Sequence, residues 1–286
     1  MVLKKIRTYG ELVMFSHTLF SLPFALISMV WAAKGLPSLD TVLWILVALI
    51  GARNGANALN RIVDKDIDKK NPRTANRHMP KGIVKEYEAW GIVIFCFIIF
   101  IFAAYKLNPL CFMLTPAALL LFFTYSYTKR FTWACHIILG IACAGAPVGA
   151  WLAVTGKFAF PPFILATIVT LWVSGFDIIY GTQDIDFDRQ NGLFSIPARF
   201  GLNYALFISS MFHLVMVLLL FSLYFIMNMG WIYLAGIFIS AILLILEHYI
   251  VSPANEKKMK IASYNINQIV SMIIMLFSLL DTFVYQ

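Results

Sequence analysis

The sequence predicts an all-α polytopic membrane protein with about nine transmembrane helices and a cytoplasmic N-terminus. Hydrophobic residues make up 61% of the 286 residues, charged residues only 13%, and the mean hydropathy is +0.82. A soluble domain carries about 25% charged residues, so this composition excludes an ordinary soluble protein. Because no linker or low-complexity stretch interrupts the chain, we expect a single domain over residues 1–286.

The apolar runs themselves are the second observation that predicts this fold. A helix needs about 20 mostly apolar residues to cross a bilayer. The third and fourth runs are short and meet at Asn108-Pro109, where we expect a tight connection. The nine predicted spans cover about residues 12–33, 41–60, 89–105, 110–127, 133–154, 161–180, 203–225, 231–251 and 262–283.

The distribution of Lys and Arg is the third observation. Eighteen of the 22 basic residues precede the first span or follow the second, fourth, sixth and eighth spans, and only Lys34, Lys106 and Lys157 lie on the other side. Cytoplasmic loops carry such an excess of positive charge, which also explains the net charge of +8 without a nucleic-acid partner. We expect the C-terminus to lie on the side of the membrane opposite the cytoplasm. The absence of an Arg- and Ser-rich leader favours a bacterial inner membrane.

Half of the acidic residues stand in two short windows at the predicted cytoplasmic ends of the second and sixth spans. A carboxylate near the hydrocarbon is costly unless it is paired or binds a cation, so these acids are candidates for function. The alternative is a helix end that reaches water among basic loop residues. These seven of the 14 Asp and Glu residues are Asp64, Asp66, Asp68, Asp177, Asp184, Asp186 and Asp188.

Helical spacing places the polar residues of the second span on one face. At 100° per residue they form a stripe about 80° wide, and Asp66 points away from it. A polar stripe on an apolar helix faces a cavity or partner helices rather than lipid. The stripe contains Arg53, Asn57, Asn60, Asp64 and Asp68.

The sixth span repeats this arrangement. Asp177, Gly181, Asp184 and Asp188 share one face, with Tyr180 beside it, while Asp186 points away. Gly181 would allow another group to approach this face closely. We expect the two stripes to serve one site.

The residue types in the stripes favour magnesium. Carboxylate oxygens are hard ligands that suit Mg²⁺ held together with substrate phosphates, and the stripes contain no His or Cys. Asp64, Asp68, Asp184 and Asp188 are therefore candidate ligands of a metal bridged by a pyrophosphate. Basic residues nearby could bind the remaining phosphate oxygens, although many serve only as loop charges. They are Arg61, Lys65, Lys69, Arg73, Arg77, Lys129, Arg130 and Arg189.

Arg53 lies inside the second span, about two turns from Asn60, and a buried arginine needs an anionic partner. A substrate carboxylate bound through two hydrogen bonds would serve, and Asn57 on the same stripe is a further candidate for substrate binding. An internal pair of Arg53 with Asp177 is equally open. His17 in the first span is either a cavity residue or a buried histidine with a protein partner.

These motifs resemble those of the UbiA superfamily of intramembrane prenyltransferases. NRIVDKDIDKKNPRTANRHMPKG resembles the first family signature, NxxxDxxxD followed by RTxxR. DIIYGTQDIDFD resembles the second signature, YxxxDxxxD, and SIPARFG resembles the segment after it. YSYTKRFT resembles the short Tyr-to-Lys segment at the end of the fourth span. The similarity extends over nearly the whole chain.

The resemblance implies a helical bundle around a central cavity with a lateral opening to the bilayer. It implies two Mg²⁺ ions that hold the pyrophosphate of a polyprenyl diphosphate. Asn60, Asp64 and Asp68 match the first metal-binding set, and Asp184 and Asp188 the second. Asp177 and Tyr180 match the cavity face and are catalytic candidates. The residues that would hold pyrophosphate are Lys129, Arg73 and Arg77.

Within the family, the chain resembles members that prenylate 4-hydroxybenzoate in ubiquinone biosynthesis. Members that prenylate a naphthoate in menaquinone biosynthesis are the alternative, and an acceptor with a carboxylate suits Arg53 in both cases. A CDP-alcohol phosphotransferase is disfavoured because DGxxAR is absent after the first Asp pair. A transporter with a cation site is more remote, since it predicts acids near the bilayer midplane rather than at one rim.

Overall fold

The computed structural model describes residues 8–13 and 18–285, and this part of the chain consists of helices and turns without a strand. Eight of its helices are long and apolar enough to cross a membrane. The predicted first span corresponds to the shorter apolar helix α2 (Thr18–Ala33). The all-α membrane fold is thereby confirmed. Lys4, Lys5, Arg7 and His17 lie outside the described residues, and the orientation in the membrane stays a prediction.

The chain divides into two compact units. Unit 1 comprises Met1–Leu19 and Ser38–Tyr127, and unit 2 comprises Phe20–Pro37 and Thr128–Gln286. Each acidic window belongs to one unit, the first to unit 1 and the second to unit 2. The expectation of a single domain over residues 1–286 stays a prediction.

Unit 1 is built around two long helices that pack along each other. A Cβ atom on Gly51 would lie 2.8 Å from the carbonyl oxygen of Cys96, so the small residue permits this close approach. The predicted tight connection at Asn108 is confirmed, and its Oδ1 accepts a hydrogen bond from the Cys111 N–H at 2.9 Å. The helices of unit 1 are α3 (Leu39–Val63), α4 (Lys65–Lys70), α5 (Glu86–Leu107) and α6 (Pro109–Tyr127).

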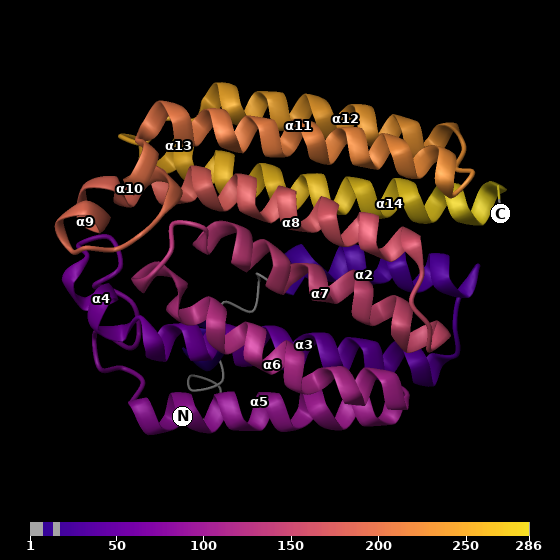
Figure 1. The fold of residues 1–286 in the computed structure, drawn as a ribbon, viewed down its shortest axis with the longest axis horizontal. Coiled ribbons are helices and arrows are strands. Elements are labelled where there is room, and N and C mark those ends of the chain that lie inside the picture. Colours follow the sequence, from indigo (N-terminus) through magenta and orange to yellow (C-terminus); the bar gives the residue numbers. More distant parts are fainter. Residues whose placement is uncertain (1–7, 14–17, 286) are drawn as a thin grey trace. The chain divides into compact units, whose positions relative to one another are not determined.

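Unit 2 is centred on one long helix, α8 (Phe160–Gly181). It packs against α7 (Cys135–Thr155) and α11 (Leu202–Ile226), while α12 (Trp231–Ile250) packs along α14 (Asn267–Tyr285) (Figure 1). Besides α2, the shorter elements are η2 (Thr128–Arg130), η3 (Thr182–Asp184), α9 (Ile185–Gln190), α10 (Ile196–Phe200), α13 (Glu256–Lys260) and the π-helical turn η4 (Ile261–Ile266).

The core of unit 2 surrounds Trp172 of α8, whose side chain is fully buried. Its ring centroid lies 5.1 Å from that of Phe24 and 5.2 Å from that of Phe176. Its indole N–H donates a hydrogen bond to Oδ1 of Asn267 at 2.7 Å, which satisfies the polar end of the buried ring. Large apolar side chains on the outside, such as Trp231 at 75% exposure, are the kind of surface that faces lipid.

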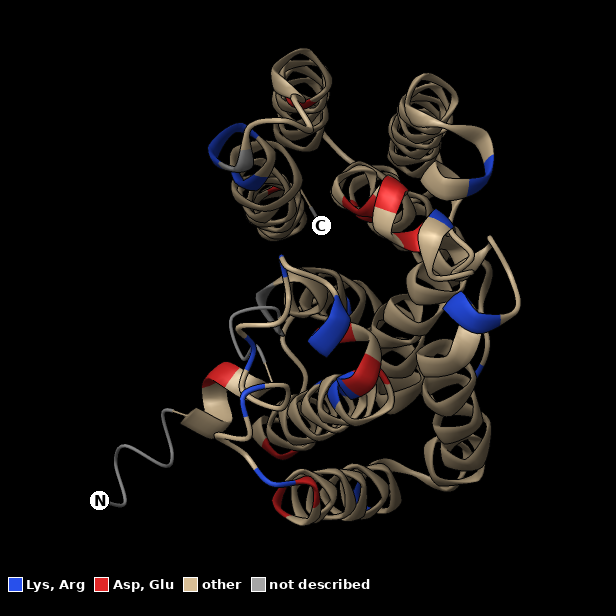
Figure 2. Ribbon diagram, turned by 90° about the vertical axis from the view of Figure 1, so that its left-hand side faces the viewer, with Lys and Arg blue, Asp and Glu red and all other residues tan. Residues whose placement is uncertain are grey.

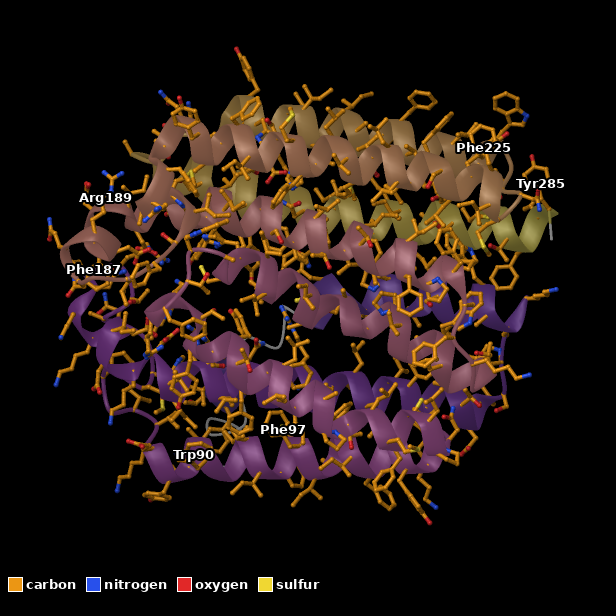
Figure 3. All side chains as sticks on the ribbon, in the orientation of Figure 1. Trp90, Phe97, Phe187, Arg189, Phe225 and Tyr285 are labelled. Carbon is orange, nitrogen blue, oxygen red and sulfur yellow. The ribbon has the colours of Figure 1, made fainter. Side chains whose placement is uncertain are left out.

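The charged residues of unit 2 gather at one end of its helices. Within unit 2, most of the ribbon coloured for Lys, Arg, Asp and Glu lies at the end that carries α9 and α10, which faces the viewer in Figure 2. Phe187 and Arg189 lie at this end, whereas Phe225 and Tyr285 lie at the opposite end (Figure 3). Unit 2 therefore has the uneven charge distribution that the positive-inside pattern predicts.

Candidate active site at two acidic helix junctions

The first acidic window forms a junction between a long and a short helix. α3 ends at Val63, and Asp64 follows with φ −90° and ψ 5°, outside the α-helical region. Its N–H still donates to the Asn60 carbonyl at 2.9 Å, and Asn60 Nδ2 donates to Asp64 Oδ2 at 3.0 Å. The helical spacing applied to this stripe is therefore interrupted at Asp64, where the chain turns before α4 begins.

The segment after α4 returns to Asp68 and holds its carboxylate. Asp68 is buried, and Nη1 of Arg77 donates to both of its oxygens at 2.7 Å. Nη1 of Arg61 lies 3.9 Å from Oδ2. The hydroxyl of Thr74 donates to the Asp68 carbonyl at 3.1 Å and fixes the turn that carries Arg77. Arg77, predicted to bind pyrophosphate, is thus the ion-pair partner of a predicted metal ligand.

The second acidic window forms a similar junction in unit 2. α8 ends at Gly181, the 3₁₀ turn η3 follows, and α9 begins after Asp184. Asp184 and Asp188 are both buried. The hydroxyl of Ser195 donates to Asp188 Oδ2 at 2.9 Å, and this hydroxyl also caps α10 by accepting the Ala198 N–H at 3.2 Å.

The two junctions share one pattern. In each, the first Asp (Asp64 or Asp184) stands at the break, and the second (Asp68 or Asp188) lies four residues later in a six-residue helix. The intervening Asp66 and Asp186 are exposed, as the helical spacing predicted.

The donor atoms in both junctions are hard oxygens that suit Mg²⁺. Within the described residues, no three His, Cys, Asp or Glu side chains are grouped as an ion would require. Asn60 pairs with Asp64, and Arg77 with Asp68, so a metal bound to the first set would share these side chains with their partners or replace the partners. The assignment of ligands stays a prediction.

Several predicted substrate-binding residues have protein partners within their own unit. Asn57 Nδ2 donates to the carbonyl of Val13 at 2.7 Å. Arg189 Nε donates to the carbonyl of Ala198 at 2.8 Å and so ties α9 to α10. Lys65, named as a possible phosphate ligand, forms a half-exposed ion pair with Glu86 at 3.1 Å.

The other predicted substrate-binding residues are half-buried. The Lys129 carbonyl accepts the Phe194 N–H at 2.8 Å, which places η2 beside the loop after α9. The backbone N–H of Arg73 donates to Asn71 Oδ1 at 3.0 Å in the turn after α4. The remaining half-buried candidates are Arg53, Arg130 and Tyr180.

His136 in α7 is a site residue that the sequence did not reveal. Its Nδ1 lies 2.7 Å from Oδ2 of Asp177, and its Nε2 is buried without a hydrogen-bond partner among the described residues. A Cβ atom on Gly181 would lie 3.0 Å from His136 Cε1, so the close approach expected at Gly181 is that of this imidazole. His136 stands in the apolar run CHIILG, where no motif marks it. The only sequence signal for His136 was that the Asp177 carboxylate, which lies in an apolar segment, needs a partner.

Comparison with known proteins gives consistent matches along the chain. The profile of the UbiA prenyltransferase family matches residues 21–269. The 4-hydroxybenzoate octaprenyltransferase of Vibrio parahaemolyticus is 28% identical over 275 residues, which cover 95% of this chain and 96% of the relative. The corresponding protein of Saccharophagus degradans is 30% identical over 174 residues, which cover 59% and 57% of the two chains.

Solved structures are similar over nearly the whole chain. A UbiA homolog from Aeropyrum pernix K1 aligns with a TM-score of 0.85 and 34% identity, covering 93% of this chain and 98% of the other. A UbiA homolog from Archaeoglobus fulgidus bound to DMAPP and Mg²⁺ aligns with a TM-score of 0.71 and 18% identity, covering 97% and 99%. At that identity the second match shows a common fold alone.

Proposed function

Because the chain belongs to the UbiA prenyltransferase family, we propose that it transfers a polyprenyl group from a polyprenyl diphosphate to a small aromatic acid of the 4-hydroxybenzoate type. The observation that carries this proposal is the pair of acidic helix junctions, each with a buried second Asp. The name of the Vibrio parahaemolyticus relative supports the acceptor class. Because the chain belongs to a family of prenyltransferases, we no longer consider the hypothesis that it is a transporter.

The junction residues fit a divalent metal by their chemistry. Asp68, Asp184 and Asp188 are buried carboxylates, which are costly in an apolar environment unless a cation or hydrogen-bond donors compensate them. We assign Asn60, Asp64 and Asp68 to one ligand set and Asp184 and Asp188 to the other. When bound, Mg²⁺ would neutralise the negative charge that develops on the departing pyrophosphate.

In the proposed reaction, the allylic C–O bond of the donor breaks and pyrophosphate leaves with the electron pair. A ring carbon of the acceptor forms a C–C bond with the allylic carbon, and that ring carbon then loses its proton. Basic side chains would hold the phosphate oxygens and stabilise the leaving group. Our candidates for this role are Arg73, Arg77, Lys129, Arg130 and Arg189.

The remaining candidates would act on the acceptor. Arg53 and Asn57 would bind its carboxylate, and Tyr180 would orient it beside the allylic group. Asp177 is our candidate for the proton acceptor, because its carboxylate is partly exposed and His136 contacts its Oδ2. We place the reaction at the cytoplasmic face of a bacterial inner membrane, on the distribution of Lys and Arg.

The proposal is tested by a prenyl-transfer assay in membranes with Mg²⁺, a polyprenyl diphosphate, and either 4-hydroxybenzoate or a naphthoate. Asp64→Ala and Asp184→Ala are expected to lose activity by about 10²-fold or more, as for the loss of a group that stabilises transition-state charge. Asp66→Ala and Asp186→Ala remove the same charge from exposed positions in the same junctions, and they should stay within a few-fold of wild type.

Transfer to 4-hydroxybenzoate that requires Mg²⁺ would support the proposed reaction. Preference for the naphthoate would instead assign the chain to a menaquinone route. Equal losses in all four Asp variants would count against the special role of the first Asp in each junction.

A further inference from the structure

The ion pair with Arg77 gives Asp68, a predicted metal ligand, a cationic partner within the protein. The Asp68 side chain is 8% exposed, and both of its oxygens accept from Nη1 of Arg77 at 2.7 Å. Removing a cation from a buried carboxylate is costly unless another cation takes its place. A metal ion that binds Asp68 therefore either replaces Arg77 or shares the carboxylate with it.

Arg77 is placed so that its side chain can change partners. It belongs to a turn that follows α4, in which its backbone N–H donates to the Thr74 carbonyl at 2.9 Å. Its side chain is 28% exposed, more than that of Asp68. Both hydrogen bonds to Asp68 come from Nη1, so the other guanidinium nitrogens can bind a phosphate through the planar fork that suits such anions.

We propose that Arg77 is an exchangeable counter-ion of Asp68, which it releases when a diphosphate provides new anionic partners. This inference rests on the proposed function and adds a binding order to it, in which the diphosphate frees Asp68 for the metal. Without a diphosphate, Arg77 competes with the metal for Asp68. With a diphosphate, Arg77 moves to the phosphate oxygens, and the carboxylate becomes available to the metal. Metal and diphosphate would then strengthen each other's binding, and this coupling is reciprocal.

A second possible role for Arg77 predicts the opposite change in metal affinity when Arg77 is removed. If Arg77 shares the carboxylate and only orients it, as outer partners of metal ligands often do, its removal would weaken metal binding. The affinity for a metal alone therefore distinguishes exchange from orientation.

The test is a titration of purified protein in detergent with Mn²⁺, a paramagnetic substitute for Mg²⁺, followed by electron paramagnetic resonance. Without a diphosphate, Arg77→Gln should bind Mn²⁺ about tenfold more tightly than wild type, within the usual range of coupling between sites. Lys70→Gln, which removes an exposed charge two residues from Asp68, should change the affinity by less than about twofold. The gain should vanish when Arg77→Gln is made in an Asp68→Asn background, because the carboxylate for which Arg77 and the metal compete is gone.

The second arm adds inorganic pyrophosphate. It should tighten Mn²⁺ binding strongly in wild type and about tenfold less in Arg77→Gln, because that variant has lost the coupling. Arg77→Lys keeps the charge without the planar fork and should fall between the two, and it serves as the test variant if Arg77→Gln does not fold.

Weaker or unchanged Mn²⁺ binding in Arg77→Gln and Arg77→Lys would overturn the exchange. This failure differs from failure of the proposed function. If wild type transfers prenyl groups and binds Mn²⁺ with pyrophosphate but the Arg77 variants gain nothing, only the exchange is lost. If wild type does neither, the proposed function falls as well.

Discussion

The imidazole of His136 and the carboxylate of Asp177 form a 2.7 Å contact between α7 and α8, one helical turn before the second acidic junction. His136 is buried, whereas the Asp177 side chain is 26% exposed. We infer that the histidine stands behind the carboxylate and fixes its orientation, as a positioning residue for the proposed proton acceptor.

His136→Ala should lower kcat/KM for prenyl transfer by about 10–100-fold, the usual effect of losing a residue that orients a functional group. His136→Asn offers an amide N–H in place of Nδ1–H and should recover much of the rate. Steady-state kinetics in membranes would measure both, and the thermal unfolding temperature would be compared in detergent. If His136→Asn were stable but as inactive as His136→Ala, orientation of Asp177 would not explain the loss.

Gly181→Ala tests the same contact from the other side. The added Cβ would lie 3.0 Å from His136 Cε1, so the ring must shift away from its position beside Asp177. We expect a loss of activity in the same range as for His136→Ala, about 10-fold or more. Gly149→Ala is the control, since its Cβ has no atom within 4 Å among the described residues. Similar rates for Gly181→Ala and wild type would show that the imidazole position is not critical.

Helical periodicity predicted the acidic faces but not how each helix ends. It identified Asp68 and Asp188 as inward-facing and Asp66 and Asp186 as exposed, because four residues complete slightly more than one turn, whereas two complete about half a turn. The turn that follows α4 depends on contacts made by later residues, such as the hydrogen bond from Thr74 to the Asp68 carbonyl. Contacts in which a later segment packs back on an earlier one are tertiary, and they leave no periodic signal in the sequence.

The pairing of His136 with Asp177 was hidden for the same reason. The two residues are 41 positions apart and meet only because α7 and α8 pack closely. Arg77 was recognised from the RTANR segment, but its partner Asp68 could not be inferred, since a basic residue near an acidic motif has many possible anions.

Asp281 is predicted to stabilise the start of α12. Its oxygens accept from the Gly230 N–H at 2.7 Å and the Tyr233 N–H at 2.9 Å, so a buried carboxylate satisfies backbone donors at a helix N-terminus. Asp281→Ala should lower the free energy of unfolding by about 1–3 kcal/mol. Lys157→Ala, at an exposed position outside the helices, should change it by less than about 0.5 kcal/mol. Thermal unfolding in detergent would compare them, and equal shifts would argue against the capping role.

The last prediction concerns Asn267, which follows the π-helical turn η4 directly. Its Nδ2 donates to Glu247 Oε1 at 2.7 Å, and its Oδ1 accepts from the Trp172 indole at 2.7 Å. Asn267→Leu would leave both partners buried and unsatisfied, and it should destabilise unit 2 by more than about 3 kcal/mol.

Glu247→Gln separates hydrogen bonding from charge at this position. The glutamine oxygen can still accept from Asn267, so we expect a change in unfolding free energy of less than about 1.5 kcal/mol if hydrogen bonding is what matters. Both variants would be followed by thermal unfolding and by hydrogen exchange of α12 and α14. Damage in Glu247→Gln equal to that in Asn267→Leu would mean that the fold depends on the negative charge of Glu247, whose Oε2 lies 3.7 Å from Nδ1 of His213.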